Sequence, residues 1–257
     1  MNLFADAQDA KVVTHDGSIT LYNHEVGECY HSKGGALAEA QNLYIGGSGL
    51  CQRLQVGHHG VLSVADIGLG LGYNACSTLA AWESQETVPD LQLTSFESDT
   101  KLIRDLLTGR GSWQSNWDHR WLGYVCRFQL GGLSSGPLQL LTSSGRHPHS
   151  LAQYTWTIVI STASSNGLRC LFDQELASVP KFDFIWQDAF SPLKNPDLWS
   201  ADWFEALRAH SQGACTLMTY SVARQVRDAL TQSGWQWQKV KAGPGTKRHW
   251  LRANPTA

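Results

Sequence analysis

The sequence contains no C-x-x-C pair, because its six cysteines lie far apart, at positions 29, 51, 76, 126, 170 and 215. This spacing argues against a structural zinc site and against a secreted disulfide scaffold. No apolar stretch approaches the roughly 20 residues that span a bilayer. The first residues also lack a basic region followed by an apolar run, so no signal peptide is expected. We therefore expect a cytoplasmic protein that makes no contact with a membrane.

Charge is also scarce. Charged residues make up 16% of the 257 residues and the formal net charge is −2, so a nucleic-acid partner would need a local basic patch. The histidine pairs His58-His59 and His147-Pro-His149 have no cysteine or carboxylate partners in the sequence. Such pairs are more often solvated loop residues than ligands, and we expect no metal.

The chain divides near residue 60. Residues 1–60 are predicted to form a β-rich extension, with a hairpin at Asp16-Gly17. From residue 61 onward, strands alternate with helices, which predicts an α/β domain over 61–257 with a mostly parallel, seven-stranded sheet. The expected strands are 61–66, 91–96, 168–172, 182–187, 214–219, 235–240 and 248–252, the last two as an antiparallel pair.

Residues from about 105 to 156 are predicted to be an insertion. A structureless loop of that length inside a domain is rare, so helical turns are expected there. Trp113, Trp117 and Trp121 are spaced so that one helix face would carry all three. We favour the interpretation that they pack the insertion onto the sheet over a base-stacking role.

The segment Val61–Asn74 contains the strongest motif, an apolar strand, three alternating glycines and the start of a helix. This geometry lets a nucleotide-like ligand approach bare backbone. A dinucleotide fingerprint would require glycine where Tyr73 stands. The pattern D-x-G-x-G-x-G-x-N instead resembles the first motif of S-adenosylmethionine-dependent methyltransferases. The candidate cofactor residues in it are Asp66, Gly68, Gly70, Gly72 and Asn74.

Glu97 follows the second expected strand, 25 residues beyond Gly72. An acidic side chain at this place can accept both hydrogen bonds of a ribose diol. The alternative is a surface glutamate at a strand end, and Asp99 is a weaker candidate for the same role. We expect Glu97 to bind the cofactor.

Asp188 ends another apolar strand, and the following Ala-Phe-Ser-Pro cannot continue a central strand. The carboxyl ends of parallel strands meet at one edge of a sheet, so Asp188 should face the same cleft as the glycines. A carboxylate there suits an amine acceptor, whose ammonium it could hold and whose proton it could take. The alternative is that Asp188 only caps the loop before Pro192.

Residues 188–199, Asp-Ala-Phe-Ser-Pro-Leu-Lys-Asn-Pro-Asp-Leu-Trp, resemble the signature of the tRNA 5-methylaminomethyl-2-thiouridine methyltransferase family. Further similar segments follow the family's order along most of residues 30–252. They are Tyr30-His-Ser32 with Gly35 and Glu39, Tyr44–Gly47, Ile67–Asn74, Ser95–Glu97, Leu217–Ser221, Val226-Arg227 and Gly243–Arg248.

The resemblance implies a Rossmann-like class I S-adenosylmethionine methyltransferase that N-methylates 5-aminomethyl-(2-thio)uridine at the tRNA wobble position. It implies that Asp188 is the catalytic carboxylate. Bifunctional members also carry a flavin-dependent oxidase after the methyltransferase half; the chain ends at residue 257, so we expect no flavin.

The tRNA anticodon stem-loop is the expected partner. Seven basic residues and a single acidic residue lie between 224 and 252, and such a surface could hold phosphates. The candidate substrate-binding residues are Phe190, Lys194, Asn195, Lys247 and Arg248. For Trp199 a core position is at least as well supported as base stacking.

One departure from the family pattern is Gln187, which would place a polar group near the chemistry, where members have an aliphatic residue. Two alternatives remain open, namely a methyltransferase for a free small-molecule amine and a non-catalytic protein that retains the fold.

Overall fold

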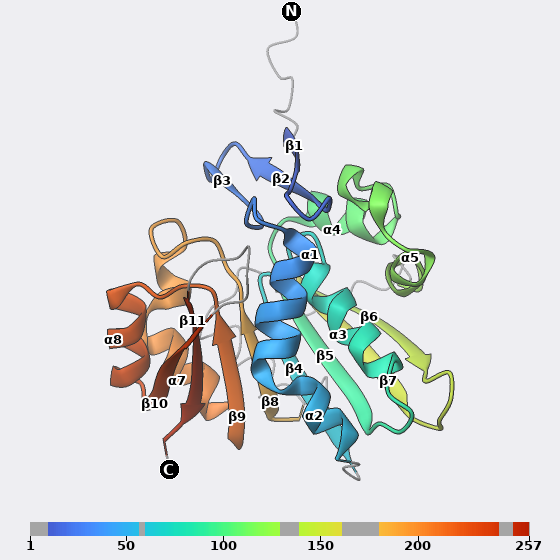
Figure 1. Cartoon of the computed structure of the whole chain (residues 1–257). Helices are drawn as coiled ribbons and strands as arrows, with labels where there is room; N and C mark the ends of the chain where they lie inside the picture. Colours follow the sequence, from blue (N-terminus) through green and yellow to red (C-terminus); the bar gives the residue numbers. More distant parts are fainter. Residues whose placement is uncertain (1–9, 57–59, 129–138, 161–179, 242–248, 257) are drawn as a thin grey trace, which may run out of the picture.

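The computed structural model describes residues 10–56, 60–128, 139–160, 180–241 and 249–256, in which the dominant element is an eight-stranded sheet (Figure 1). Its strand order is β10-β11-β9-β8-β4-β5-β7-β6. In chain order the strands are β4 (Val61–Ile67), β5 (Asp90–Glu97), β6 (Gln139–Arg146), β7 (Gln153–Ile160), β8 (Phe182–Gln187), β9 (Ser211–Thr219), β10 (Trp235–Lys241) and β11 (His249–Pro255). The five strands from β9 to β7 are parallel, whereas β6, β10 and β11 pair antiparallel. The predicted mostly parallel sheet is confirmed, with β6 as an additional edge strand.

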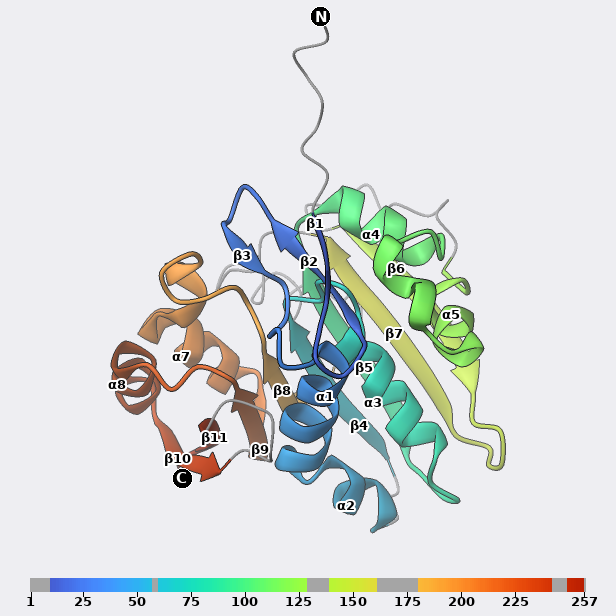
Figure 2. The ribbon, with the colours of Figure 1, turned by 45° about the horizontal axis from the view of Figure 1, so that its top comes forward.

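Helices cover both faces of this sheet, because neighbouring residues of its inner strands point to opposite sides. Val64 packs into one apolar cluster and Ala65 into the other. The first cluster takes side chains from α1 (Ala36–Glu39), α2 (Leu50–Gln55), α3 (Tyr73–Glu83), α4 (Thr100–Leu107) and α5 (His119–Val125). The second takes them from α7 (Ala201–Ala209) and α8 (Arg224–Gln232). Figure 2 shows α1 and α2 one after the other on the first face, with α3 beside them.

The strand that follows β5 in the sheet is β7, which corrects the prediction of a third strand at 168–172. β7 pairs with β5 in parallel register from Tyr154 to Ile160, and with β6 in an antiparallel hairpin. Both strands lie within or next to the segment in which helical turns were expected. The run YTWTIVI is rich in β-branched and aromatic residues, which favours a strand. Residues 168–172 lie outside the part of the chain that the structure describes.

The tryptophans of this segment do not share one continuous helix. The 3₁₀ helix η2 (Ser112–Asn116) ends before Trp117, and Asp118 begins α5 by accepting hydrogen bonds from the amides of Arg120 and Trp121. The indole of Trp113 is buried and donates to the carbonyl of Leu71 at 3.0 Å. The packing interpretation is therefore confirmed for Trp113, which joins the segment to the glycine turn.

The N-terminal residues form a separate three-stranded sheet of β1 (Ala10–Val13), β2 (Ile19–Asn23) and β3 (Glu28–Cys29), with the predicted turn at Gly17. Residues 36–55, however, are helical in α1, the π-helix η1 (Ala40–Gly46) and α2, so the prediction of a β-rich extension is wrong for them. The hydroxyl of Tyr73 accepts from the amide of Ile19 at 3.2 Å and donates to its carbonyl at 2.9 Å. These two hydrogen bonds attach the small sheet to the start of α3. Among the described helices, none has the length and apolarity required to cross a membrane.

Candidate functional site

The glycine turn lies between β4 and α3, and all three of its glycines have positive φ: +89° at Gly68, +50° at Gly70 and +86° at Gly72. Gly68 also lies against the loop that follows β8. A Cβ atom at Gly68 would lie 2.9 Å from the carbonyl oxygen of Asp188. Glycine is therefore required at residue 68 both by conformation and by close approach. Gly68 and Gly70 line a cavity of about 110 Å³, which we call the turn cavity.

Glu97, at the end of β5, lies in the turn cavity beside these glycines. One carboxylate oxygen accepts from the amide of Gly70 at 2.9 Å, and the other accepts from the amides of Ser98 and Asp99. Burial raises the pKa of Glu97, against the opposing effect of these three amides. Asp99 itself caps α4, where one carboxylate oxygen accepts from the amides of Lys101 and Leu102, and it does not line the turn cavity.

Asp66 has no exposed surface and does not line the turn cavity. One of its carboxylate oxygens accepts from the hydroxyl of Ser95 at 2.9 Å, and that hydroxyl in turn accepts from the indole of Trp156 at 3.0 Å. The other oxygen has no hydrogen-bond partner in the described residues. Burial raises the pKa of Asp66 to about 7. Its hydrogen bond therefore joins β4 to β5, and the contact of Asp66 with the cofactor stays a prediction.

We expect Asp66→Asn to raise the free energy of unfolding at pH 8 but to change it little at pH 4. A carboxyl with a pKa of about 7 in the folded state binds more protons there than in the unfolded state between pH 4 and 7. Stability therefore falls as the pH rises through this window, by on the order of 2 to 4 kcal/mol for this group. Chemical denaturation at several pH values measures the gap between variant and wild type. Asp202→Asn, at an exposed carboxyl on α7, is the control; an equal gap at both pH values would contradict the prediction.

Asp188 follows β8 directly and is half-buried at the edge of the turn cavity. Its carboxylate accepts from the side-chain amide of Asn74 at 2.7 Å. Burial, followed by the nearby negative charge of Glu39, raises the pKa of Asp188 well above its usual range. The structure thus brings Asn74, at the start of α3, against the carboxylate that the sequence singled out.

A second cavity, of about 430 Å³, also has Asp188 in its lining, and we call it the carboxylate cavity. It shares five lining residues with the turn cavity, namely Tyr30, His31, Asp188, Ala189 and Phe190. Three carboxylates and several aromatic rings line it, with Lys33 as the one lysine among its lining residues. Besides the shared residues these are Glu28, Glu39, Tyr22 and Tyr220. The cavity therefore favours a cation.

For four of the residues around Asp188, the sequence pattern predicted no individual role. His31 is buried, burial lowers its pKa to about 4, and its Nε2 has no hydrogen-bond partner in the described part of the chain. Tyr44 is buried near Asp188, and burial raises its pKa well above the usual range. Glu39 and Tyr220 complete the set. The only sequence signal for these four residues was the ordered family resemblance, whose segments contain all of them.

The loop after Asp188 is held in place by side chains from three directions. Tyr220 donates to the carbonyl of Ala189 at 2.9 Å, and the indole of Trp199 donates to the carbonyl of Phe190 at 2.8 Å. Glu28 accepts from both the amide and the hydroxyl of Ser191. Trp199 is buried, which confirms the core position for this residue. The loop is thereby fixed between the small sheet and β9.

Gln187 is a correction to the sequence interpretation. Its side chain is fully buried and points toward α7 and the following loop, away from the two cavities. Its amide nitrogen donates to the carbonyl of Leu198 at 2.9 Å, and its oxygen accepts from the indole of Trp203 at 3.0 Å. The polar side chain of Gln187 therefore has its hydrogen-bond partners within the protein, and it adds no polar group to the site around Asp188.

The remaining predicted residues divide between the cavities and their surroundings. Phe190 lies 5.0 Å from Tyr30, ring centre to ring centre, between the two cavities. Asn195 lines the turn cavity, and Lys194 is exposed with its ammonium over the β2–β3 turn. Gly72 lies instead against Leu106 of α4. Lys247 and Arg248 lie outside the residues that the structure describes.

Comparisons with known proteins bear on this geometry. A family model described as S-adenosyl-L-methionine-dependent methyltransferase matches residues 156–256. The tRNA 5-methylaminomethyl-2-thiouridine biosynthesis bifunctional protein MnmC of Azoarcus sp. strain BH72 is 30% identical over 244 residues, which cover 91% of this chain and 34% of that protein. The protein of the same name from Delftia acidovorans is 30% identical over 234 residues, covering 91% and 33%. The chain thus spans about a third of the length of these relatives.

The solved structure of MnmC2 from Aquifex aeolicus has a similar fold, with a TM-score of 0.71 at 21% identity. The match covers 97% of this chain and 71% of that one. Together these findings confirm the resemblance inferred from the sequence. The fold is the Rossmann-like fold of S-adenosylmethionine-dependent methyltransferases.

Proposed function

We propose that this chain, an S-adenosylmethionine-dependent methyltransferase related to the methyltransferase portion of the bifunctional MnmC proteins, N-methylates 5-aminomethyl-(2-thio)uridine at the wobble position of tRNA. The observation that carries the proposal is the meeting of two cavities at Asp188. One cavity offers bare glycine backbone and a carboxylate at the end of β5, as a nucleoside-like cofactor requires. The other offers carboxylates and aromatic rings, as a cationic amine requires.

The residues around the turn cavity fit S-adenosylmethionine. Gly68 and Gly70 leave backbone uncovered there, and Glu97 can accept from one ribose hydroxyl through the lone pair of Oε2 that the Gly70 amide leaves free. His31, whose Nε2 has no partner in the described residues, offers a further polar contact. When bound, the cofactor supplies an electrophilic methyl group on a sulfonium.

Asp188 would hold the acceptor and manage its proton. Alkyl amines with a pKa of about 10.4 are protonated at neutral pH, and only the neutral nitrogen has a lone pair that can react. Asp188 binds the ammonium through its carboxylate and takes the proton from that nitrogen. The raised pKa of Asp188 suits this transfer, because it brings the carboxyl closer to the pKa of the amine. Asn74 keeps the carboxylate in place through its 2.7 Å hydrogen bond.

A surface on α8 and β10 suits the phosphates of an anticodon stem. Arg227 stacks over the indole of Trp237, with its guanidinium carbon 5.4 Å from the ring centre. Lys239 and Lys241 project from β10 and are exposed. Arg224 pairs with Asp228 at 3.4 Å, which leaves the other cations without a nearby acid among the described residues of these two elements.

The double substitution Lys239→Ala and Lys241→Ala is expected to weaken tRNA binding without changing cofactor binding. Each lost phosphate contact lowers the slope of log K against log salt by about one, so the slope should fall by about two. Filter binding over a salt series measures it. The matched control is the double substitution Lys101→Ala and Lys181→Ala, at two exposed lysines outside β10, and an equal loss in that variant would contradict a phosphate-binding role for β10.

The experiment that tests the proposed function is mass analysis of wobble nucleosides from undermodified tRNA incubated with the protein and S-adenosylmethionine. A gain of one methyl group on 5-aminomethyl-2-thiouridine supports the proposal. Methyl transfer to simple alkyl amines but not to tRNA would favour the free-amine alternative. Calorimetry that detects no binding of S-adenosylmethionine would favour a non-catalytic protein and would contradict methyl transfer both to tRNA and to a free amine.

A further inference from the structure

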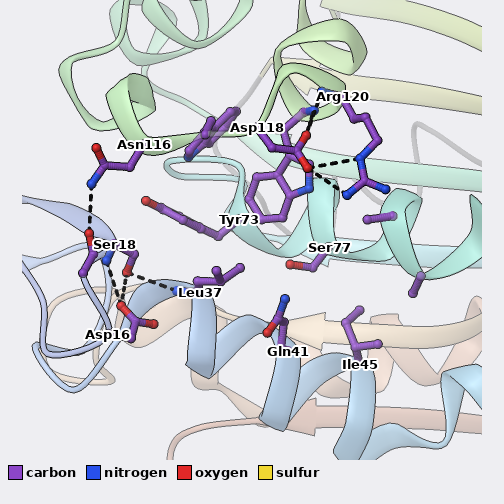
Figure 3. Close-up of a pocket in the computed structure, with 15 residues that line it drawn as sticks. Asp16, Ser18, Leu37, Gln41, Ile45, Tyr73, Ser77, Asn116, Asp118 and Arg120 are labelled. Atoms are coloured by element: carbon purple, nitrogen blue, oxygen red, sulfur yellow. Dashed lines mark hydrogen bonds and ion pairs between the residues drawn. The ribbon is translucent and has the colours of Figure 1, made fainter. Parts of the chain in front are cut away.

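A third cavity, of about 610 Å³, lies apart from the site described above (Figure 3). Helices α1, η1 and α3 form one side of it, and η2 with the start of α5 forms the other. It shares no lining residue with the turn cavity or the carboxylate cavity. An edge-to-face contact of 5.2 Å joins Tyr73, which lines this cavity, to His31, which lines the other two.

Three aromatic rings form one wall of this aromatic cavity (Figure 3). The rings of Trp117 and Trp121 meet edge to face at 5.2 Å, and Tyr73 meets them at 5.7 and 5.9 Å. Leu37, Ile45 and two alanines of α3 supply the apolar part of the lining. Such a wall favours a flat ring, because planar groups gain both apolar burial and stacking against aromatic faces.

The aromatic cavity also contains a buried hydroxyl that is not satisfied by the protein. Ser77 is 4% exposed and lines the cavity, yet its Oγ has no hydrogen-bond partner in the described residues. A buried polar atom without a partner costs free energy, which a ligand atom could recover. The Gln41 side chain points into the same space and can both donate and accept (Figure 3).

Among the described residues, the one cationic side chain that lines the cavity is already paired, so it is not available to bind an anionic ligand. Asp118 pairs with Arg120 at 2.8 Å. Asp16 accepts from the Thr14 hydroxyl and the Ser18 amide, which lie in the turn between β1 and β2. It also accepts from the amide of Ala38 at 2.8 Å. With two carboxylates and one guanidinium, the rim disfavours a phosphate or a carboxylate inside the cavity.

We propose that the aromatic cavity binds a neutral planar nitrogen heterocycle of nucleobase size. The ring stacks on the indoles, and its edge atoms meet the Ser77 hydroxyl and the Gln41 amide. Such a ring can come from a free nucleoside or from an unstacked base of an RNA. This inference does not depend on the proposed methyl transfer, since the cavity lies outside both parts of that site.

The test measures the fluorescence of 2-aminopurine riboside, and of a short RNA hairpin carrying 2-aminopurine in its loop, as the protein is added. Stacking on an indole quenches the probe. Ala80→Phe places a ring in the cavity from α3 and should weaken binding by more than about tenfold. Ser77→Ala removes only the unpartnered hydroxyl and should weaken it by about three- to tenfold without loss of stability. Ala209→Phe, at the exposed end of α7, is the control and should change neither probe binding nor stability.

Quenching of the free riboside identifies a nucleoside as the ligand. Quenching of the hairpin alone identifies an RNA base. Either result supports the proposal if Ala80→Phe abolishes the quenching. The titrations are repeated with S-adenosylhomocysteine present. Binding that this compound displaces and that Ala80→Phe leaves intact belongs to the turn cavity and would overturn the proposal. Absence of any quenching would overturn it as well, whether or not the protein proves to methylate tRNA.

Discussion

Replacing Asp188 with Asn is expected to lower kcat for methyl transfer by about 10²- to 10⁴-fold, the range for loss of a general acid–base group. The Kd for S-adenosylmethionine should change by less than about threefold, because the cofactor-facing groups stay in place. The amide that replaces the carboxylate keeps its shape and can still accept from Asn74 through its oxygen. It cannot take a proton from the acceptor nitrogen. Single-turnover methylation of undermodified tRNA and calorimetry with the cofactor measure the two quantities.

Asp197→Asn is the matched control, because this exposed carboxylate lies on the same loop and lines neither cavity of the site. It should retain wild-type turnover. The wild-type pH profile adds a second check. The ionised form of Asp188 is the active base, and its pKa is raised, so activity should rise with pH through a range above that of an ordinary carboxyl. Loss of folding in Asp188→Asn, measured by thermal denaturation, would support a capping role for Asp188 instead.

Three predicted parts of the site come from the ends of parallel strands. Gly68 and Asp188 follow β4 and β8, Glu97 ends β5, and these three strands are neighbours in the sheet. Strand ends can be recognised from apolar runs and breakers, and the topology of a parallel sheet places them together. Local pattern and tertiary position therefore agree at this edge.

The acceptor side was not predictable in the same way. Glu39 lies on α1 and Tyr220 follows β9, and neither carries a local motif that would give it a role beside Asp188. Tyr220 lies at the carboxyl end of a parallel strand next to β8, so only its role, and not its place, was missed. The position of Glu39 depends on how the N-terminal segment folds over the sheet, which no periodicity encodes. The aromatic cavity was missed for a related reason. Trp117 and Trp121 were expected on one helix, whereas the cap at Asp118 starts a new helix between them.

Two hydrogen bonds connect the glycine turn to the loop that carries Asp188. The amide of Asp188 donates to the carbonyl of Ile67 at 2.9 Å, directly before Gly68. Asn74, on the far side of the turn, donates to the Asp188 carboxylate. A displacement of the turn therefore moves both the surface that faces the cofactor and the base, so a single substitution there should affect binding and turnover together.

Gly68→Ala is the substitution that tests this coupling, and we expect it to lower the free energy of unfolding by about 1 to 3 kcal/mol. The φ of +89° strains any L side chain, and the added Cβ would lie 2.9 Å from the carbonyl oxygen of Asp188, which is backbone and cannot rotate away. The turn and the loop must separate to relieve this contact. The Kd for S-adenosylmethionine should therefore rise by more than about tenfold, and kcat should fall as well.

Gly123→Ala separates this effect from the general cost of changing a glycine. Gly123 lies within α5, has no positive φ, and a Cβ there would meet no atom within 4 Å. Its substitution should stabilise the protein by about 0.5 to 1 kcal/mol through helix propensity and leave turnover unchanged. Denaturant titration, calorimetry and single-turnover assays compare the two variants. If Gly68→Ala loses stability but keeps wild-type Kd and kcat, the turn does not position the cofactor and Asp188 jointly, and the two cavities act independently.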